Sequence, residues 1–146
     1  MLLPFITRFP IPKFKVEKDF QWWLGKQIHD HHGMWWPYHK MSDMSIDKKP
    51  CDCFYVDELG RTYFMELKII DGYTFNINKM ESQQVEFLSK LSKMQKRFDD
   101  FPELVDYTSS LALLLVYSKK LHEWKCLHWI AVEKELLEHG SIKVFS

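Results

Sequence analysis

The 146-residue sequence carries no excess charge of either sign, because 20 Lys and Arg residues balance 20 Asp and Glu residues. A chain that is basic throughout is therefore excluded, and any basic surface for nucleic acid must be local. Cysteine is also scarce. Cys51, Cys53 and Cys126 are odd in number and lack metal-site spacing, which favours free thiols in a reducing cytosol over a disulfide framework. We therefore expect a cytoplasmic protein.

Long hydrophobic runs are missing as well. The longest, LALLLVY from Leu111, is far shorter than the roughly 20 residues that a membrane-spanning helix needs. The opening MLLPFITRFPIP is apolar, but prolines interrupt it and it has no small-residue cleavage site, so it does not predict a signal peptide. We expect no association with a membrane.

Aromatic residues, by contrast, are plentiful at 16% of the chain, which indicates a dense core, a large contact surface or both. The length favours one domain over residues 1–146 that is large enough to bury a core. Residues 1–14 are predicted to form an extended N-terminal arm ahead of that core.

The pattern of apolar and turn-forming residues predicts elements in the order α-β-β-β-α-β-β-α. This order is typical of an α/β fold with one mixed central β-sheet flanked by helices. Pro37 marks the first strand as an edge or irregular strand. Asn78 and Glu81 form a capping-box-like start to the long helix. The predicted elements are a helix over 17–31 ending at Gly33, a strand over 34–40, a hairpin over 49–68, a loop over 69–78, a long helix after 78, strands over 110–118 and 124–132, a helix over 133–139 ending at Gly140, and a loosely ordered tail.

The hairpin contains charged residues in segments that otherwise resemble buried strands. The loop 58–60 ends in glycine, which predicts a three-residue turn closed by a left-handed residue. In that register Asp52 lies opposite Glu66, and directly opposed side chains lie on the same side of a sheet. Lys68 shares this side because side chains alternate along a strand.

Two directly opposed carboxylates repel one another, and a divalent cation between them reverses the sign of the interaction. Hard oxygen ligands suit Mg²⁺, which keeps several waters and takes one or two protein carboxylates. A lysine beside the metal can position an attacking water or stabilise charge on a phosphate. The alternative is purely structural, with Lys68 forming a simple ion pair with Asp52 or Glu66. The residues alone leave both interpretations open.

The pattern resembles the motif of the PD-(D/E)xK nuclease superfamily, in which an Asp at the start of one strand precedes (D/E)-x-K in the next. Here Pro50 is followed by an interposed Cys51 and then by Asp52, and the next strand contains Glu66-Leu67-Lys68. The interposed residue is a small departure, since the Asp and the ExK carry the chemistry.

A second stretch of the chain is similar to a narrower group. The segment Thr74-Phe75-Asn76-Ile77 precedes a helix with the pair Gln83-Gln84, as in RecU-type Holliday junction resolvases and related phage-type nucleases. Three motifs therefore occur in the family's order, and the resemblance covers about residues 17–132. It implies a restriction-endonuclease-like core with a mixed four-stranded sheet.

The resemblance also implies an activity, that of a metal-dependent DNA endonuclease and most of all a Holliday junction resolvase. Asp52 and Glu66 would hold Mg²⁺, for which Mn²⁺ can substitute. Lys68 would orient the attacking water, and Gln84 would assist. From the residues alone, Gln84 can instead be a polar side chain on the inward stripe of its helix that bonds to a backbone group.

The first helix departs from the family pattern. In these nucleases it often supplies a Glu to the site, but Gln21 stands about where that Glu would fall. Glu17 lies one turn earlier on the same helix face. Either residue is a candidate to join the site.

Branched or duplex DNA is the expected partner, and four positively charged residues are candidates for phosphate contacts: Lys49, Lys90, Lys93 and Arg97. The alternative for the three residues on the long helix is a solvated face. A homodimer is also expected, because two symmetric cuts across a junction suit a two-fold axis with two sites. The aromatic pairs Trp22-Trp23 and Trp35-Trp36 would each leave one ring available. The dimer is the preferred use of these rings, and stacking on unpaired bases is the alternative.

Two rival functions remain open. A repair, restriction or recombination nuclease acting on other DNA would show the same motif, which encodes the chemistry and not the shape of the substrate. A non-catalytic DNA-binding module of the same fold is the second rival. Neutral net charge and the missing helix glutamate favour the module, and the intact set Asp52, Glu66 and Lys68 opposes it.

Overall fold

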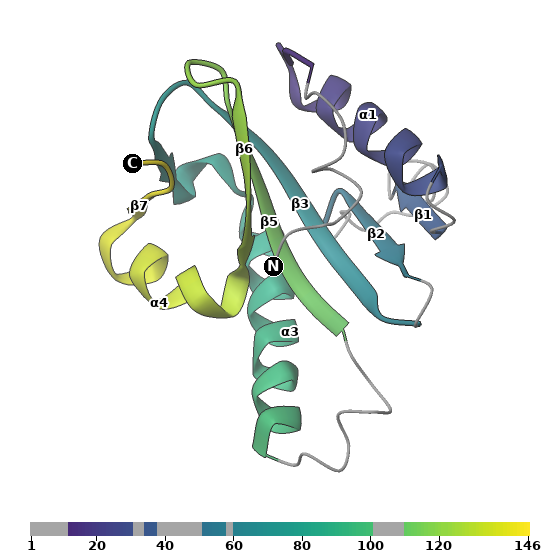
Figure 1. The fold of residues 1–146 in the computed structure, drawn as a ribbon. Helices are drawn as coiled ribbons and strands as arrows, with labels where there is room; N and C mark the ends of the chain where they lie inside the picture. The colour runs from purple at the N-terminus through teal and green to yellow at the C-terminus, as the bar shows by residue number, and fades with distance from the viewer. Residues whose placement is uncertain (1–11, 31–33, 38–50, 58–59, 101–109) are drawn as a thin grey trace.

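The computed structural model describes residues 12–30, 34–37, 51–57, 60–100 and 110–146 (Figure 1). The elements are α1 (Glu17–Asp30), β1 (Met34–Pro37), β2 (Cys53–Val56), β3 (Thr62–Ile70), β4 (Thr74–Asn76), the 3₁₀ turn η1 (Ile77–Lys79), α3 (Ser82–Asp100), β5 (Ser110–Ser118), β6 (Glu123–His128), α4 (Trp129–His139) and β7 (Ser141–Lys143). Most of the expected arm, with Gly33, Lys49 and Pro50, lies outside the described residues.

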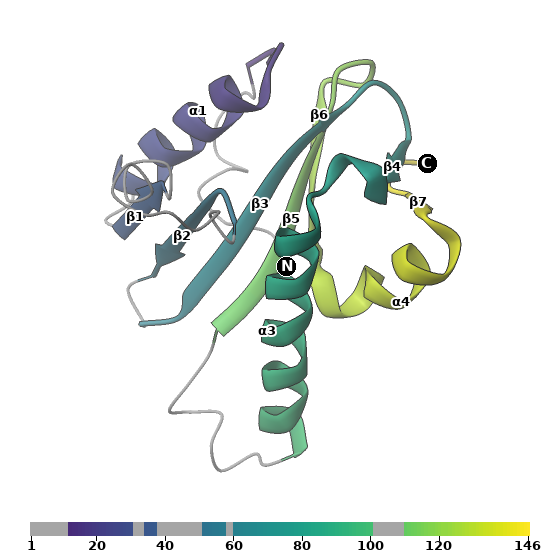
Figure 2. The same cartoon turned by 180° about the vertical axis from the view of Figure 1, so that it is seen from behind.

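Five strands form one mixed sheet in the order β1-β2-β3-β5-β6. β3 and β5 pair in parallel, and the other neighbours pair antiparallel. Helix α1 lies on one side of the sheet, and α3 and α4 lie on the other, as the views from front and back agree (Figures 1 and 2). The predicted mixed central sheet with flanking helices is therefore confirmed, and Pro37 lies on an edge strand as predicted.

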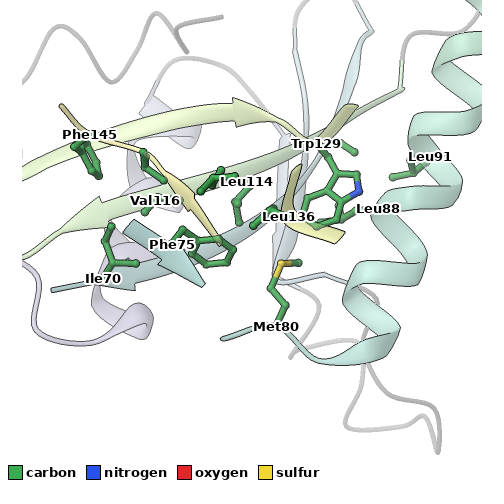
Figure 3. Close-up of a cluster of buried hydrophobic side chains, with 13 residues drawn as sticks. Ile70, Phe75, Met80, Leu88, Leu91, Leu114, Val116, Trp129, Leu136 and Phe145 are labelled. Atoms are coloured by element: carbon green, nitrogen blue, oxygen red, sulfur yellow. The ribbon is translucent and has the colours of Figure 1, made fainter. Parts of the chain in front are cut away.

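Each face of the sheet is covered by a separate apolar core. Strand β3 supplies both, because its alternate side chains point to opposite faces. Among the described residues, α3 and α4 cover the core shown in Figure 3, which contains Ile70, Phe75, Met80, Leu88, Leu91, Ala112, Leu114, Val116, Trp129, Leu136, Ile142, Val144 and Phe145. The core beneath α1 contains Phe14, Phe20, Leu24, Cys53, Tyr55, Tyr63, Met65, Leu67, Ile69, Leu113, Leu115 and Tyr117.

The hairpin register is as predicted. Strands β2 and β3 pair residue for residue from Cys53 with Met65 to Val56 with Thr62. The turn closes with a backbone hydrogen bond from the N–H of Asp57 to the carbonyl of Arg61, at 3.0 Å. Gly60 has a φ of 80°, a left-handed conformation that glycine adopts without steric cost. One step beyond Cys53 and Met65, this register places Asp52 opposite Glu66.

The prediction of a loop over 69–78 and a loosely ordered tail was wrong. Thr74–Asn76 and Ser141–Lys143 form a second, two-stranded sheet. The buried side chains of Phe75 and Ile142 hold it against the core in Figure 3. Strands of three residues are too short to show an alternating pattern, so only their contact in space reveals them.

The start of the long helix was also predicted three residues too early. The side chain of Asn76 accepts the N–H of Asn78 and caps η1, and α3 begins at Ser82. The N–H of Glu81 donates to Gln84 Oε1 at 2.9 Å, as the N-cap amide does in a capping box. One of the two bonds of a capping box is therefore present, and it joins residues 81 and 84 instead of 78 and 81.

The boundary between the last long strand and α4 differs from the prediction over 124–132. β6 ends at His128, and α4 begins at Trp129. Trp129 and Leu136 are both buried seven residues apart, which is two helical turns. The short apolar run WIAV fits a strand or a helix equally well from its pattern. The C-cap prediction is confirmed, because Gly140 ends α4 with a φ of 78°.

A membrane-spanning helix has to be both long and apolar. In the part of the chain that the structure describes, no helix combines the length and the hydropathy that crossing a membrane requires.

Candidate functional site

Three charged side chains gather where β2 and β3 separate. Asp52 directly precedes β2, and Glu66 and Lys68 lie in the second half of β3. All three are buried, with exposed fractions of 7%, 0% and 7%. Ionised groups are costly to bury unless they are paired and hydrogen-bonded, so their partners decide what this cluster can do.

Asp52 and Glu66 hold one another through reciprocal hydrogen bonds. The backbone N–H of Asp52 donates to Glu66 Oε2 at 3.1 Å, and the N–H of Leu67 donates to Asp52 Oδ2 at 2.8 Å. A side-chain hydrogen bond also joins the two carboxyl groups. The predicted opposition of these residues is therefore present as two carboxyl groups on one side of the sheet, held by the backbone of both strands.

Lys68 lies beside this pair. Its Nζ is 3.1 Å from Glu66 Oε1 and 3.9 Å from Glu17 Oε2. Because Glu17 comes from α1, the lysine connects the first helix to the carboxyl pair on β3. The ion pair offered as the structural alternative does exist, but it involves a carboxylate that also shares a hydrogen bond with Asp52.

Gln84 fixes the other side of Glu66. Its Nε2 donates to Glu66 Oε1 at 2.7 Å, while its Oε1 accepts the N–H of Glu81. The acceptor end of the amide is occupied by the start of α3, so the donor end must face the carboxyl group. Both roles considered for Gln84 are thus present together, a backbone contact and a position at the carboxyl pair.

The electrostatics of the cluster oppose a second negative charge. Burial, and next the nearby Asp52, raise the pKa of Glu66 to about 8, and Lys68 opposes the rise. Burial also raises the pKa of Glu17, again against the effect of Lys68. Burial, followed by the charges of Glu66 and Asp52, raises the pKa of the Cys51 thiol. Carboxylates in this arrangement favour a bound proton or a bound cation.

The donor set fits a divalent cation of the Mg²⁺ class. Asp52 and Glu66 offer hard oxygen ligands on one side of the sheet, and Mg²⁺ needs only one or two protein carboxylates. Within the described ranges, no three His, Cys, Asp or Glu side chains gather as a metal site. The Cys51 thiol is a poor candidate because Mg²⁺ prefers oxygen.

The first helix contributes two side chains in different ways. Gln21 Nε2 donates to the backbone carbonyl of Asp52 at 3.1 Å, so it positions the backbone and does not present a ligand. Glu17 is half-exposed, lies near Lys68 and accepts a hydrogen bond from the backbone of Ile69. The charge of Asp52 raises its pKa, which places it within electrostatic reach of the carboxyl pair.

Lys90 and Lys93, the two candidate phosphate contacts on α3 whose side chains are described, do not contact this cluster. Lys90 is exposed and forms an ion pair with Glu86 at 3.0 Å, one turn away on the same helix. Lys93 is exposed as well. These positions agree with the solvated-face alternative. The side chain of Arg97, and Lys49 as a whole, lie outside the described residues.

Lys79 is a site-flanking residue that the sequence did not single out. Its Nζ donates to the carbonyl of Ile69 at 3.4 Å, and its charge opposes the rise that burial causes in the pKa of Glu17. An exposed lysine in a polar turn gives no signal by itself. Only the position of η1 beside the end of β3 brings it to the cluster.

Polar side chains also complete an open edge of β3. β2 pairs with β3 as far as Met65, and beyond that residue Asp52 accepts the N–H of Leu67. Further along the same edge, Ile69 bonds to Glu17 through one backbone group and to Lys79 through its carbonyl. The cluster therefore occupies the edge that β2 leaves when it turns away.

Comparisons with known proteins add little to this geometry. No family model matches the chain, and no curated protein matches it at a significant level. Among solved structures, the chain is similar to Hjc, a Holliday junction resolvase from the archaeal hyperthermophile Archaeoglobus fulgidus. The TM-score is 0.47 and the identity 12%, over 75% of this chain and 73% of that chain. At these values the likeness supports no conclusion about activity, which has to come from the site itself.

Proposed function

We propose that the chain is a metal-dependent DNA endonuclease of the PD-(D/E)xK type, with four-way junctions as its preferred substrate. One observation carries the proposal: Asp52 and Glu66 are buried as an adjacent carboxyl pair, with Lys68 3.1 Å from Glu66. A purely structural ion pair would need one carboxylate. A second one beside the first costs stability unless the pair holds a proton or a cation, and a cation is the occupant that this proposal assigns.

Asp52 and Glu66 would hold Mg²⁺, and Mn²⁺ would substitute for it. When bound, the ion would polarise the phosphodiester and lower the pKa of the attacking water. Gln84 keeps Glu66 Oε1 in place, and the N–H of Leu67 does the same for Asp52. Fixed ligand orientation of this kind is what hydrogen-bonded partners of a metal site provide.

Lys68 is the protein side chain that supplies positive charge at the site, in addition to the metal ion. Its ammonium can hold the attacking water by a hydrogen bond and stabilise charge on the phosphate as that charge develops. Glu17, 3.9 Å from the same ammonium, helps to keep the lysine side chain directed at the cluster. Lys68 therefore acts in this proposal as an orienting group for the water and the phosphate.

Junction resolution adds a requirement for two sites. We propose a homodimer, because paired nicks in opposing strands of a junction follow from two identical sites around a two-fold axis. Sedimentation at micromolar concentration, with and without junction DNA, tests this part. A monomer under both conditions would contradict it and leave the nuclease chemistry in place.

The decisive experiment is a cleavage assay on three DNA substrates side by side: a four-way junction, a Y-fork and a linear duplex. Mg²⁺ should support paired nicks in the junction, EDTA should abolish them, and Ca²⁺ should support binding with little cutting because its coordination is looser. Equal cutting of the junction and the duplex would remove the junction preference only. Absence of metal-dependent cutting on every substrate would leave the non-catalytic DNA-binding module.

A matched pair of variants guards against a contaminating nuclease. Asp52→Asn keeps the shape of the side chain but removes one ligand charge, so it should abolish cleavage. Asp19→Asn makes the same chemical change at an exposed position of α1 and should cut like the wild type. Equal activity of the two variants would contradict the assignment of Asp52.

A further inference from the structure

The first helix presents an exposed aromatic ring beside the site. Trp22 is 71% exposed, the largest exposed fraction among the large hydrophobic residues of the described chain. Its neighbour Trp23 is half-buried and packs against Phe14 and Phe20, so the prediction that one ring of this pair is available is confirmed. Tryptophan is enriched at contact surfaces, because its ring offers a large apolar face with a polar handle.

Lysines flank this ring along the same face of α1. Lys18, Trp22 and Lys26 follow at intervals of four residues, which places them in one row along a helix. The Nζ of Lys26 lies 5.9 Å from the centre of the Trp22 ring, a cation–π distance. We refer to these three side chains as the α1 row.

The surroundings of the α1 row are positively charged, although the whole chain is neutral. Four lysines are exposed between residues 12 and 27, and they are Lys13, Lys15, Lys18 and Lys26. Asp19 is the one exposed carboxylate in that range, since Glu17 is half-buried against Lys68. This segment therefore supplies a local basic surface of the kind that the neutral composition requires of a DNA-binding chain.

The α1 row also borders the candidate site. Glu17 and Gln21 form the adjacent row of the same helix, and they contact Lys68 and Asp52 respectively. Trp22 follows Gln21 directly. From Glu17 to Trp22 the helix rises about 7.5 Å and turns by roughly 140°, so the ring lies on the outer side of α1. A strand that reaches the site around this outer side would pass the Trp22 ring.

We propose that the α1 row binds a DNA strand next to the cleavage site, with Trp22 stacking on an unpaired base and Lys18 and Lys26 neutralising neighbouring phosphates. The proposal rests on the proposed function in taking DNA as the ligand. Aromatic rings with adjacent cations bind single strands in this way, because every base offers a face for stacking and every linkage a charge. Unpaired bases are available at a branch point and absent from a continuous duplex.

Charge argues against a second copy of the chain as the occupant. A two-fold interface brings the same patch of both subunits together, so Lys18 and Lys26 would face their own copies around Trp22. Lysine is depleted in the interface cores of protein complexes. A polyanion complements the same surface without repulsion. The predicted homodimer would therefore use a different surface from the α1 row.

Binding measured in Ca²⁺, without cutting, tests the proposal with an oligothymidine 20-mer and a fully paired 20-base-pair duplex as probes. Trp22→Ala should weaken binding of the single strand about tenfold and leave the duplex within about twofold. Trp22→Phe should restore most of the loss. Unchanged single-strand binding by Trp22→Ala would overturn the proposal, as would an equal loss on both probes.

Lys18 and Lys26 are tested separately, through the dependence of DNA affinity on salt concentration. The Lys18→Ala/Lys26→Ala double variant should reduce the slope of log affinity against log salt by roughly 1.4 on the single strand and 1.8 on the duplex, as the loss of two phosphate contacts predicts. Lys134→Ala changes an exposed lysine of α4 and should leave the slope unchanged. An unchanged slope in the double variant would remove the lysines from the proposal.

Two further results separate this proposal from its rivals. If Trp22→Ala lowers the oligomeric state in sedimentation and leaves DNA binding intact, the α1 row is a protein interface and the proposal is wrong. If the wild type binds single strands through Trp22 but cuts no DNA with Mg²⁺, the proposed nuclease function fails and the binding surface stands. If the wild type cuts and Trp22→Ala has wild-type affinity and KM, the binding surface alone fails.

Discussion

The two halves of β3 satisfy the backbone groups at one edge of the strand in different ways. From Thr62 to Met65 the strand is paired on both edges, with β2 on one side and β5 on the other. From Glu66 to Ile70 the pairing with β5 continues, but side chains replace β2. Both halves are buried, so their backbone groups need partners in either case.

The difference shows why the charged cluster lies where it does. In the first half, the backbone of a neighbouring strand satisfies the edge, and the side chains are free to be apolar. In the second half, carboxylates and an ammonium group have to reach the edge, and they come from α1, the residue before β2, and η1. A site that doubles as a sheet edge is held rigidly, which is what catalysis by fixed charges requires.

Replacing Lys68, the cation in the second half of β3, should have the largest effect on activity. Lys68→Ala removes the ammonium that is proposed to orient the water and stabilise charge, so kcat for junction cleavage should fall about 10²- to 10³-fold. Junction affinity in Ca²⁺ should change far less, because Lys68 is proposed to act on the water and on the charge that develops during cleavage. Single-turnover kinetics measure the first and titration the second. Lys134→Ala is the control, and a loss of affinity as large as the loss of kcat would make Lys68 a binding residue.

Changing the first half should affect folding and not the chemistry. Met65→Ala empties space in the core beneath α1, where Met65 has no exposed surface, and should lower the free energy of unfolding by about 2–5 kcal/mol. Met94→Ala, at a residue that is 52% exposed, should stay within about 0.5 kcal/mol. Urea unfolding measures both. A large fall in kcat per folded molecule of Met65→Ala would contradict the expectation that the first half of β3 affects folding alone.

The amide that supports Glu66 should have an intermediate effect. Gln84→Ala leaves the N–H of Glu81 and Glu66 Oε1 each short of a partner, at a cost of about 1–3 kcal/mol. Gln83→Ala removes a partly exposed side chain that contacts Glu81 and should cost about 0.5 kcal/mol or less. Equal melting temperatures for the two variants would show that Gln84 is not needed to hold the carboxyl pair.

The smallest expected effect is a pH-dependent shift in the melting temperature of the metal-free protein. The pKa of Glu66 rises from its ordinary value of 4.5 to about 8 in the folded state. Below pH 4.5 Glu66 is protonated in both the folded and the unfolded state, so its ionisation does not change the free energy of unfolding. As the pH rises towards 8, the unfolded chain releases this proton more readily, so the folded state loses stability.

Asp52→Asn removes the charge that helps to raise this pKa, and the amide can still accept the N–H of Leu67. The variant should therefore match the wild type near pH 5 and melt about 2–5 °C higher near pH 8. Calorimetry in EDTA from pH 5 to 8.5 measures the difference, with Asp19→Asn as the control. A large destabilisation of Asp52→Asn at all pH values would favour the structural ion pair over a metal site.

The sequence by itself determined the hairpin and therefore the site. Turn chemistry at Gly60 sets the register, and the register puts Asp52 opposite Glu66 with Lys68 on the same side. The flanked mixed sheet also followed from the sequence, because long apolar patterns are strong local signals. Local rules are sufficient wherever neighbours in sequence are also neighbours in space.

Only the tertiary structure decided the rest of the site. The distinction between Glu17 and Gln21, the position of Lys79, and the contact of Gln84 with Glu66 depend on how α1, η1 and α3 pack on β3. The β4–β7 pair joins segments more than 60 residues apart, and neither segment is long enough to show a period of its own. Such contacts depend on burial and pairing across the whole chain, which no short stretch of sequence encodes.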